Sequence, residues 1–95
     1  MTAIDKSSIV ASKNAVSCDL AGESVILDMK SGKYFALDDV GTRIWQLLQS
    51  PSTLQSICDQ LTQEYDVSME RSVAEVSTLL RRLVDQGLAT YAEAV

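Results

Sequence analysis

The chain has 95 residues, of which 46% are hydrophobic, and its 8 basic and 13 acidic residues give a formal net charge of -5. This length predicts one domain with a modest core, and this hydrophobic fraction excludes a disordered chain. The acidic balance disfavours nucleic-acid binding, and the sequence holds no apolar run of about 18 residues that would span a membrane.

The N-terminal stretch, residues 1–14, has no hydrophobic period and is diluted by polar residues. It lacks the basic and apolar segments of a signal peptide, so we expect a cytoplasmic protein. We predict a flexible arm over residues 1–13, with order beginning near Val10 or later, at the start of a single domain over residues 1–95.

Three segments with the composition of strands follow this arm. Residues 15–20 alternate apolar and polar side chains, residues 24–29 are rich in β-branched side chains, and residues 33–37 contain aromatic ones. Short turns separate the segments, and Gly32 permits a positive φ in the second turn. We therefore predict an antiparallel meander of three strands.

The alternation within each segment also predicts which side chains face the core, because successive side chains of a strand point to opposite faces. In the first two strands the expected core-facing residues are Val16, Cys18, Leu20, Val25, Leu27 and Met29, with Ile26 and Asp28 on the opposite face. In the third strand, Phe35 and Leu37 point one way and Tyr34 and Ala36 the other.

At Asp38-Asp39 the hydrophobic spacing changes from the strand period to the helix period. One of these two aspartates is expected to cap a first helix, which ends near Ser50, before Pro51. Gly41 in its first turn indicates close packing of the helix on the sheet. The apolar stripe of this helix comprises Val40, Ile44, Trp45, Leu47 and Leu48.

Two further helices are predicted after Pro51. Ser52 and Gln55 have the spacing of a capping box for the second helix, and Ser68 is expected to cap the third. Gly87 ends the third helix, Leu88 packs back on it, and the tail over residues 89–95 adds little. The apolar face of the second helix comprises Leu54, Ile57, Cys58, Leu61 and Tyr65, and that of the third Met69, Val73, Val76, Leu80, Leu83 and Val84.

The residue types needed for catalysis or metal binding are scarce. The chain has no His and only two Cys, Cys18 and Cys58, which are far apart in sequence and are interpreted as small buried hydrophobic residues. The pair Asp38-Asp39 is explained by helix capping, and no glycine-rich phosphate loop is present. We therefore expect a binding protein without catalytic residues, metal or cofactor.

The third strand is the best candidate for a binding surface, because an exposed strand edge is a template for another strand. The segment over residues 33–37 has one Lys and no Pro, so little in it blocks pairing. An extended peptide would add to such an edge through main-chain hydrogen bonds. The residues alone leave open whether a peptide, the N-terminal arm or a helix covers this edge.

The run from Gly32 to Leu48 carries a family resemblance. It reads Gly-Lys-Tyr-Phe-Ala-Leu-Asp-Asp-Val-Gly-Thr-Arg-Ile-Trp-Gln-Leu-Leu. This run resembles the signature of proteins related to the pyrroloquinoline quinone biosynthesis protein D, the PqqD-like recognition elements of ribosomally synthesised peptides, and the resemblance extends more weakly to Leu88. It implies an α+β, winged-helix-like domain in which a three-stranded antiparallel sheet is followed by three helices.

The resemblance also implies a site. Family members hold a leader peptide as an added strand on the third strand, in a groove walled by the third helix. Leu79 and Arg82 are the preferred specific contacts on that helix, because they flank its buried arc. The implied peptide-binding residues are Lys33, Tyr34, Phe35, Ala36, Leu37, Ser72, Val76, Leu79, Arg82 and Leu83.

Several hypotheses about function remain open at this point. The stand-alone form looks most like the recognition half of a split lasso-peptide leader protease, which presents the precursor peptide to a separate cysteine protease. The alternative in the same class is a quinone-pathway peptide chaperone that delivers its peptide to a radical-SAM enzyme. A winged-helix DNA-binding regulator and a structural subunit without a peptide ligand are the other readings, and a homodimer formed through the strand edge is possible in each.

Overall fold

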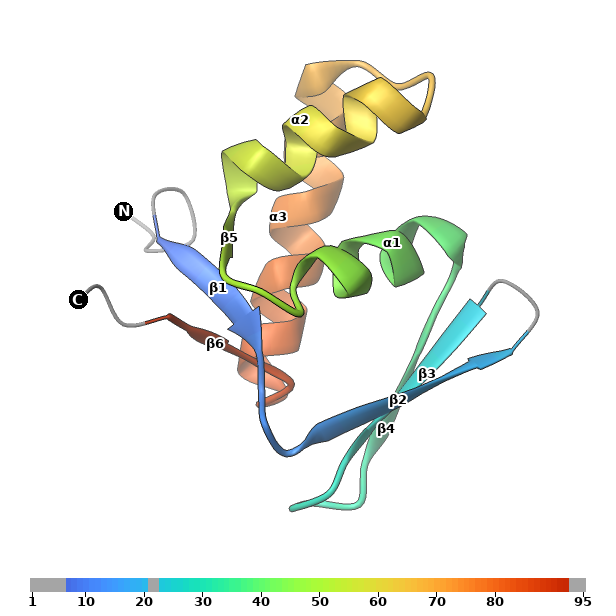
Figure 1. Cartoon of the computed structure of the whole chain (residues 1–95), viewed down its shortest axis with the longest axis vertical. Helices are drawn as coiled ribbons and strands as arrows, with labels where there is room; N and C mark the ends of the chain where they lie inside the picture. Colours follow the sequence, from blue (N-terminus) through green and yellow to red (C-terminus); the bar gives the residue numbers. More distant parts are fainter. Residues whose placement is uncertain (1–6, 21–22, 93–95) are drawn as a thin grey trace.

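The computed structural model describes residues 7–20 and 23–92. Their order is β1 (Ser8–Ala11), β2 (Ala15–Leu20), β3 (Glu23–Asp28), β4 (Tyr34–Leu37), α1 (Asp39–Leu47), β5 (Ser52–Thr53), α2 (Leu54–Glu64), α3 (Met69–Asp85) and β6 (Ala89–Tyr91). Strands β2, β3 and β4 form the predicted antiparallel meander, and the three predicted helices follow it (Figure 1). The predicted α+β class is thus confirmed. No helix in the described part of the chain is long and apolar enough to cross a membrane.

A second small sheet joins the two ends of the described chain. Its order is β5-β1-β6, with β1 antiparallel to both neighbours (Figure 1). Ile9 at its centre is 0% exposed. The prediction of a flexible arm is therefore wrong for Ser8–Ala11, and the tail adds more than expected because Ala89–Tyr91 form β6. Residues 1–6 of the predicted arm lie outside the described residues.

The prediction of which side chains face the core is right for β4 and reversed for β3. Leu37 is buried and Phe35 packs against the core, whereas Tyr34 is 75% exposed. The register places Ile26 opposite Phe35, so Ile26 is buried and its neighbour Leu27 faces outward. Asp28 shares a face with Ile26 as predicted, but this face is buried, contrary to the prediction.

The burial of Asp28 has a local cause. Its carboxylate accepts hydrogen bonds from the Lys30 backbone N–H at 3.0 Å and from the Ser31 hydroxyl at 2.9 Å, within the turn before β4. These bonds, that of Lys30 first, lower the pKa of Asp28. Because the turn satisfies this carboxylate, the strand tolerates an acid on its inner face.

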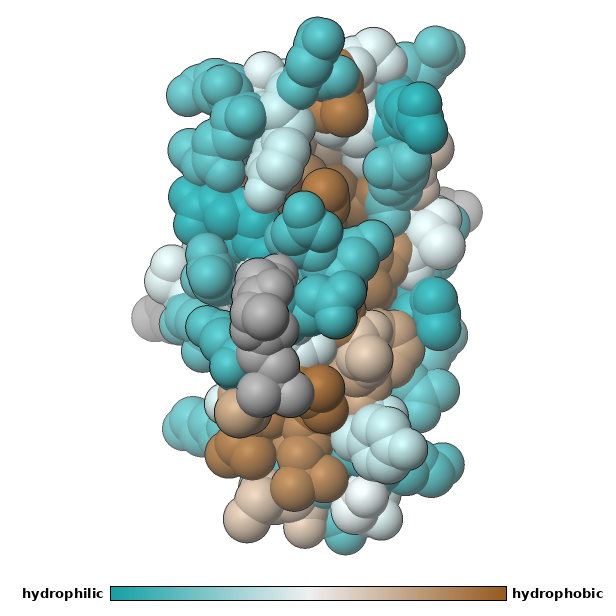
Figure 2. All heavy atoms as spheres, turned by 90° about the vertical axis from the view of Figure 1, so that its right-hand side faces the viewer, coloured by the Kyte–Doolittle hydropathy of each residue, from teal (hydrophilic) through white to brown (hydrophobic). Residues whose placement is uncertain are grey.

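The outer face of the β2-β3-β4 sheet is apolar and exposed. Val16 is 48% exposed and Leu27 is 38% exposed, and both were expected in the core. Cys18 is exposed as well, so its predicted burial is wrong, whereas the buried Cys58 is as predicted. Figure 2 shows hydrophobic residues gathered on the lower part of this side of the molecule.

The helix boundaries follow from local capping. Asp38 caps α1, with Oδ1 accepting the Gly41 N–H at 2.8 Å, and Ser68 caps α3 as predicted. The cap of α2 is Thr53, not Ser52, because Ser52 pairs in β5 and donates its hydroxyl to the Leu47 carbonyl at 2.9 Å. At the end of α3, Gly87 has φ 78° and the Leu88 N–H donates to the Leu83 carbonyl at 2.9 Å, as expected for a glycine-terminated helix.

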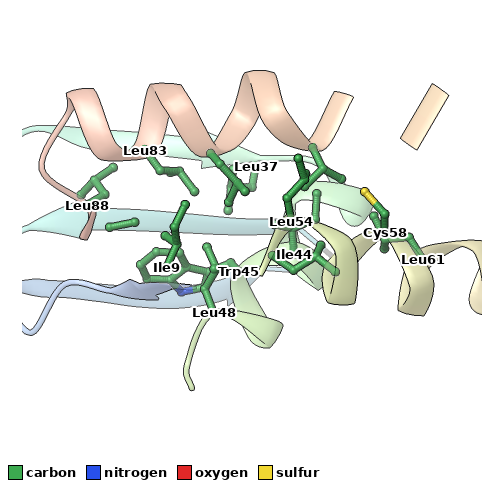
Figure 3. Close-up of a cluster of buried hydrophobic side chains, with 14 of the residues drawn as sticks. Ile9, Leu37, Ile44, Trp45, Leu48, Leu54, Cys58, Leu61, Leu83 and Leu88 are labelled. Atoms are coloured by element: carbon green, nitrogen blue, oxygen red, sulfur yellow. The ribbon is translucent and has the colours of Figure 1, made fainter. Parts of the chain in front are cut away.

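The core lies where the three helices meet the two sheets. Figure 3 shows Ile9, Trp45 and Leu88 gathered at one end of this core and Cys58 and Leu61 at the other. Residues from β1, β3, β4 and all three helices contribute to it. The core therefore fixes β4, α1 and α3 relative to one another, which positions the site described next.

Candidate functional site

Strand β4 lies at one edge of the β2-β3-β4 sheet, and no strand in the described part of the chain pairs with its outer side. The Asp28 N–H donates to the Lys33 carbonyl at 2.9 Å, which identifies residues 28 and 33 as a hydrogen-bonded pair. Such pairs alternate along an antiparallel ladder. Phe35 and Leu37 therefore direct their backbone groups to β3, and Tyr34 and Ala36 direct theirs to the open edge.

A groove of about 770 Å³ runs along this edge. Strand β4 forms one side of it, the first turns of α1 form its end, and one face of α3 forms the opposite wall. Its lining residues are Tyr34, Phe35, Ala36, Leu37, Asp38, Val40, Gly41, Ile44, Ala74, Glu75, Thr78, Leu79 and Arg82. A strand edge inside a groove can take an extended chain whose side chains reach the wall.

The three charged residues of the lining differ in their partners. Asp38 is occupied by its cap on the Gly41 N–H. Glu75 pairs with Arg71 at 3.2 Å, although both side chains are mostly exposed. Arg82 places its guanidinium 4.9 Å from the centroid of the Phe35 ring. Both acidic residues thus have partners, and the basic residue lies beside Phe35 in the first half of β4.

Gly41 allows α1 to approach the end of β4 closely. A Cβ atom at this position would lie 3.2 Å from both Cβ and Cδ2 of Leu37 and 3.2 Å from Oδ1 of Asp38. The predicted role of this glycine, close packing of the first helix on the sheet, is confirmed.

The structure brings together only some of the residues that the family resemblance implied. Six of them line the groove: Tyr34, Phe35, Ala36, Leu37, Leu79 and Arg82. Ser72, Val76 and Leu83 are buried in the interior of the protein instead of lining the groove, because they lie on the inner arc of α3. Lys33 is exposed in the turn before β4.

Sequence reasoning missed two parts of the lining. On α3 it missed Ala74, Glu75 and Thr78, although Glu75 and Thr78 lie three or four residues from the expected contacts Leu79 and Arg82 and so share one helix face with them. That spacing was visible in the sequence. The contribution of Val40, Gly41 and Ile44 from α1 was hidden within a stripe that otherwise reads as core.

The groove has the groups for binding an extended peptide. It offers free backbone donors and acceptors on β4, apolar side chains on α1 and α3, and a positive charge at Arg82. Within the described residues, no cluster of His, Cys, Asp or Glu is arranged to hold a metal ion. Cys58 lies on the buried face of α2 and does not line the groove, and burial raises the pKa of its thiol.

Comparison with known proteins gives a consistent result. The family model described as coenzyme PQQ synthesis protein D (PqqD) matches residues 23–89, which include all of β4, α1 and α3. No curated protein matches the chain.

Two solved structures share the fold. One is TbiB1 in complex with the TbiA(beta) leader peptide, which is 34% identical, with a TM-score of 0.79 over 88% of this chain and 99% of that chain. The other is a lasso peptide synthetase B1 complexed with the leader peptide, which is 24% identical, with a TM-score of 0.76 over 86% of this chain and 96% of that chain. The second likeness, at this low identity, supports the fold alone.

Proposed function

The chain belongs to the coenzyme PQQ synthesis protein D (PqqD) family, and from this premise we propose that it binds the leader segment of a ribosomally synthesised precursor peptide. The observation that carries the proposal is the open edge of β4 inside a groove walled by α3. The leader complex of TbiB1, a 34% identical protein, supports it.

We propose that the leader binds as an additional strand on β4. The outward backbone groups of Tyr34 and Ala36 would then pair with the leader, and each hydrogen bond contributes about 0.5–1.5 kcal/mol net. Alternate side chains of the leader would face the groove, where Leu79 and the apolar residues of α1 meet them. Affinity would thus come from hydrogen bonds to the β4 backbone, and selectivity would come from the side chains of α1 and α3 that line the groove.

Not every residue implied by the resemblance needs to touch the leader in this arrangement. Tyr34, Phe35, Ala36, Leu37, Leu79 and Arg82 are the proposed contacts, since they line the groove. Ser72, Val76 and Leu83 would act indirectly, by holding α3 against the core. Lys33 would meet the leader only where it leaves the groove.

The partner enzyme is the second part of the proposal. We propose that the whole chain acts as one non-catalytic domain that presents the precursor to a separate cysteine leader protease in lasso-peptide biosynthesis. The likeness to TbiB1 favours this reading over delivery of the peptide to a radical-SAM enzyme. Neither reading requires a catalytic residue in this chain.

Titration calorimetry tests the proposal. The full chain is titrated with synthetic peptides that cover the N-terminal halves of the small open reading frames beside its own gene. Saturable one-to-one binding of one such peptide is the expected result, and a stretch of double-stranded DNA serves as the control for the regulator reading. Failure of every neighbouring peptide to bind, or tighter binding of DNA, would overturn the proposal.

The choice of partner needs a separate experiment. The protease and the radical-SAM enzyme encoded nearest to the gene are each mixed with the precursor, with and without this protein. We expect the protein to accelerate removal of the leader by the protease. Acceleration of the radical reaction alone would assign the chain to the quinone-type pathway instead.

A further inference from the structure

Arg82 has unused hydrogen-bonding capacity at the wall of the groove. Its guanidinium lies 4.9 Å from the Phe35 ring centroid, and neither ion pair among the described residues involves it. Arg43 provides the contrast, because it donates two hydrogen bonds to Glu64, at 2.8 Å and 2.7 Å. In a chain with 13 acidic residues, Arg82 is thus kept apart from carboxylates in the described structure.

The aromatic contact holds this cation ready for a ligand. A guanidinium over an aromatic ring is attracted to the face of the ring and loses part of its rotational freedom. Its N–H donors point outward from the edge of the planar group, where a carboxylate can accept two of them. Because Phe35 already orders the side chain, binding an anion there costs less entropy than binding at a free arginine.

The register of an added strand places one ligand side chain at this position. Side chains directly opposite each other on neighbouring strands lie on the same face of the sheet. A peptide residue opposite Phe35 therefore points to the inner face, toward Arg82. The peptide residue opposite Leu37 lies two positions away, on the same face, which is the face of the groove whose apolar lining includes Val40 and Leu79.

We propose that Arg82, ordered by Phe35, is a carboxylate-binding position that selects leaders carrying Asp or Glu two residues from a large apolar side chain. This inference rests on the proposed function and adds the chemistry of the preferred ligand. A Lys or Arg in the leader at this position is disfavoured by like-charge repulsion. Antiparallel strands pair slightly more stably than parallel ones, so the apolar residue precedes the acidic one in the leader.

A displayed library of random 12-residue peptides tests the inference without knowledge of the natural leader. The full chain, its R82E variant and its R81E variant are each used for selection. Arg81 is the matched control, because it is the neighbouring exposed arginine of α3 and does not line the groove. Thermal unfolding of each variant checks that the fold is kept.

We expect the unaltered protein and R81E to enrich peptides with an acidic residue two positions after a large apolar one. R82E should enrich Lys or Arg at the same position. Identical enrichment by the unaltered protein and R82E, with no charge preference, would overturn the inference while leaving peptide binding in place. Enrichment of no peptide by the unaltered protein would overturn the proposed function as well.

Affinity measurements with one selected peptide show how much the contact with Arg82 contributes to binding. Replacing its acidic residue by the matching amide should weaken binding about tenfold, which is the scale of one charge-assisted hydrogen-bond pair at a partly exposed site. The R82Q variant should bind both peptides equally, because the partner of the carboxylate is gone. Equal loss in R82Q and R81Q would instead indicate general charge attraction and would contradict a specific site.

Discussion

The two edges of the β2-β3-β4 sheet differ mainly in their surroundings. Strand β2 is unpaired on its outer side among the described strands, as β4 is. The Met29 N–H donates to the Asn14 carbonyl at 2.8 Å, so by the same alternation Ala15, Ser17 and Asp19 direct their backbone groups away from β3. Only β4, however, borders the groove formed with α1 and α3.

This difference separates two parts of strand addition, the pairing of backbone groups and the recognition of side chains. Both edges direct backbone N–H and C=O groups outward, although the Ala15 N–H of β2 already donates to the Ser12 carbonyl at 3.1 Å, so either edge could pair with an extended chain in a sequence-independent way. Side chains that could form pockets for a ligand line the groove beside β4, where Leu79 and Arg82 come from α3, and no β2 residue is part of that lining. If the protein recognises a leader, we therefore expect recognition at β4 and none at β2.

Proline substitutions at the two edges give the largest expected effect. Ala36→Pro removes an N–H that points to the open edge of β4, and its ring obstructs an incoming strand. We expect binding of the leader to weaken by about 100-fold or more, which corresponds to roughly 3 kcal/mol. Isothermal titration measures the loss, and circular dichroism shows whether the sheet is retained.

Ser17→Pro is the matched control, since it removes an outward N–H from the β2 edge in the same sheet. Its affinity for the leader should equal that of the unaltered protein. A native spectrum with full affinity in Ala36→Pro, or an equal loss in both variants, would show that the β4 edge is not the distinguishing feature.

An acidic substitution on the face of α3 that lines the groove should have an intermediate effect on leader affinity. Leu79 is half-buried and lines the groove, so Leu79→Asp replaces an apolar contact with a charge that the leader must desolvate. We expect affinity to fall about tenfold, with the unfolding temperature little changed. Met69→Asp makes the same exchange on the same helix outside the groove and should leave affinity intact. Similar losses in both variants would point to a general charge effect.

The smallest expected effect on leader affinity comes from an ion pair outside the groove, between α1 and α2. The bidentate pair between Arg43 of α1 and Glu64 of α2 joins the two helices, and this pair, with a bond from Gln60, lowers the pKa of Glu64 to about 2 from an ordinary value of 4.5. A carboxyl whose pKa is lowered by folding adds stability above pH 4.5, and this stability is lost as the pH falls toward 2.

Glu64→Gln should therefore lower the unfolding temperature slightly at pH 7, and its difference from the unaltered protein should shrink between pH 4.5 and pH 2. Leader affinity at pH 7 should change less than in Leu79→Asp. Glu75→Gln, which breaks the more exposed pair with Arg71, should alter the unfolding temperature less. A constant difference across the pH range would exclude the ion pair as its cause.

The parts of the fold that could be predicted are those with local signals. Asp38 and Ser68 cap helices through bonds to residues three positions on, and Gly87 ends α3 with a positive φ. These features depend on neighbours in sequence, so the sequence indicates them directly. The helical part of the groove wall likewise follows from the spacing of Glu75, Leu79 and Arg82.

The features that were missed depend on contacts between distant segments. Strand β1 is four residues long and is stabilised by β5 and β6, which lie far along the chain. The face of β3 was reversed because Asp28 is satisfied by its own turn, while Leu27 is left outside. In a strand as short as β3, one buried acid and one exposed leucine are enough to make the apolar and polar pattern ambiguous. The pattern then does not indicate which face of the strand is buried.

Amide hydrogen exchange of the free and leader-bound protein tests the central claim most directly, because it reports on single backbone groups without a substitution. The Tyr34 and Ala36 N–H groups should exchange at least about tenfold more slowly when the leader is bound, since they become part of a ladder. The Ser17 N–H on the β2 edge should exchange at the same rate in both states. Saturated binding without protection of Tyr34 and Ala36, or with protection of Ser17 instead, would contradict strand addition at β4.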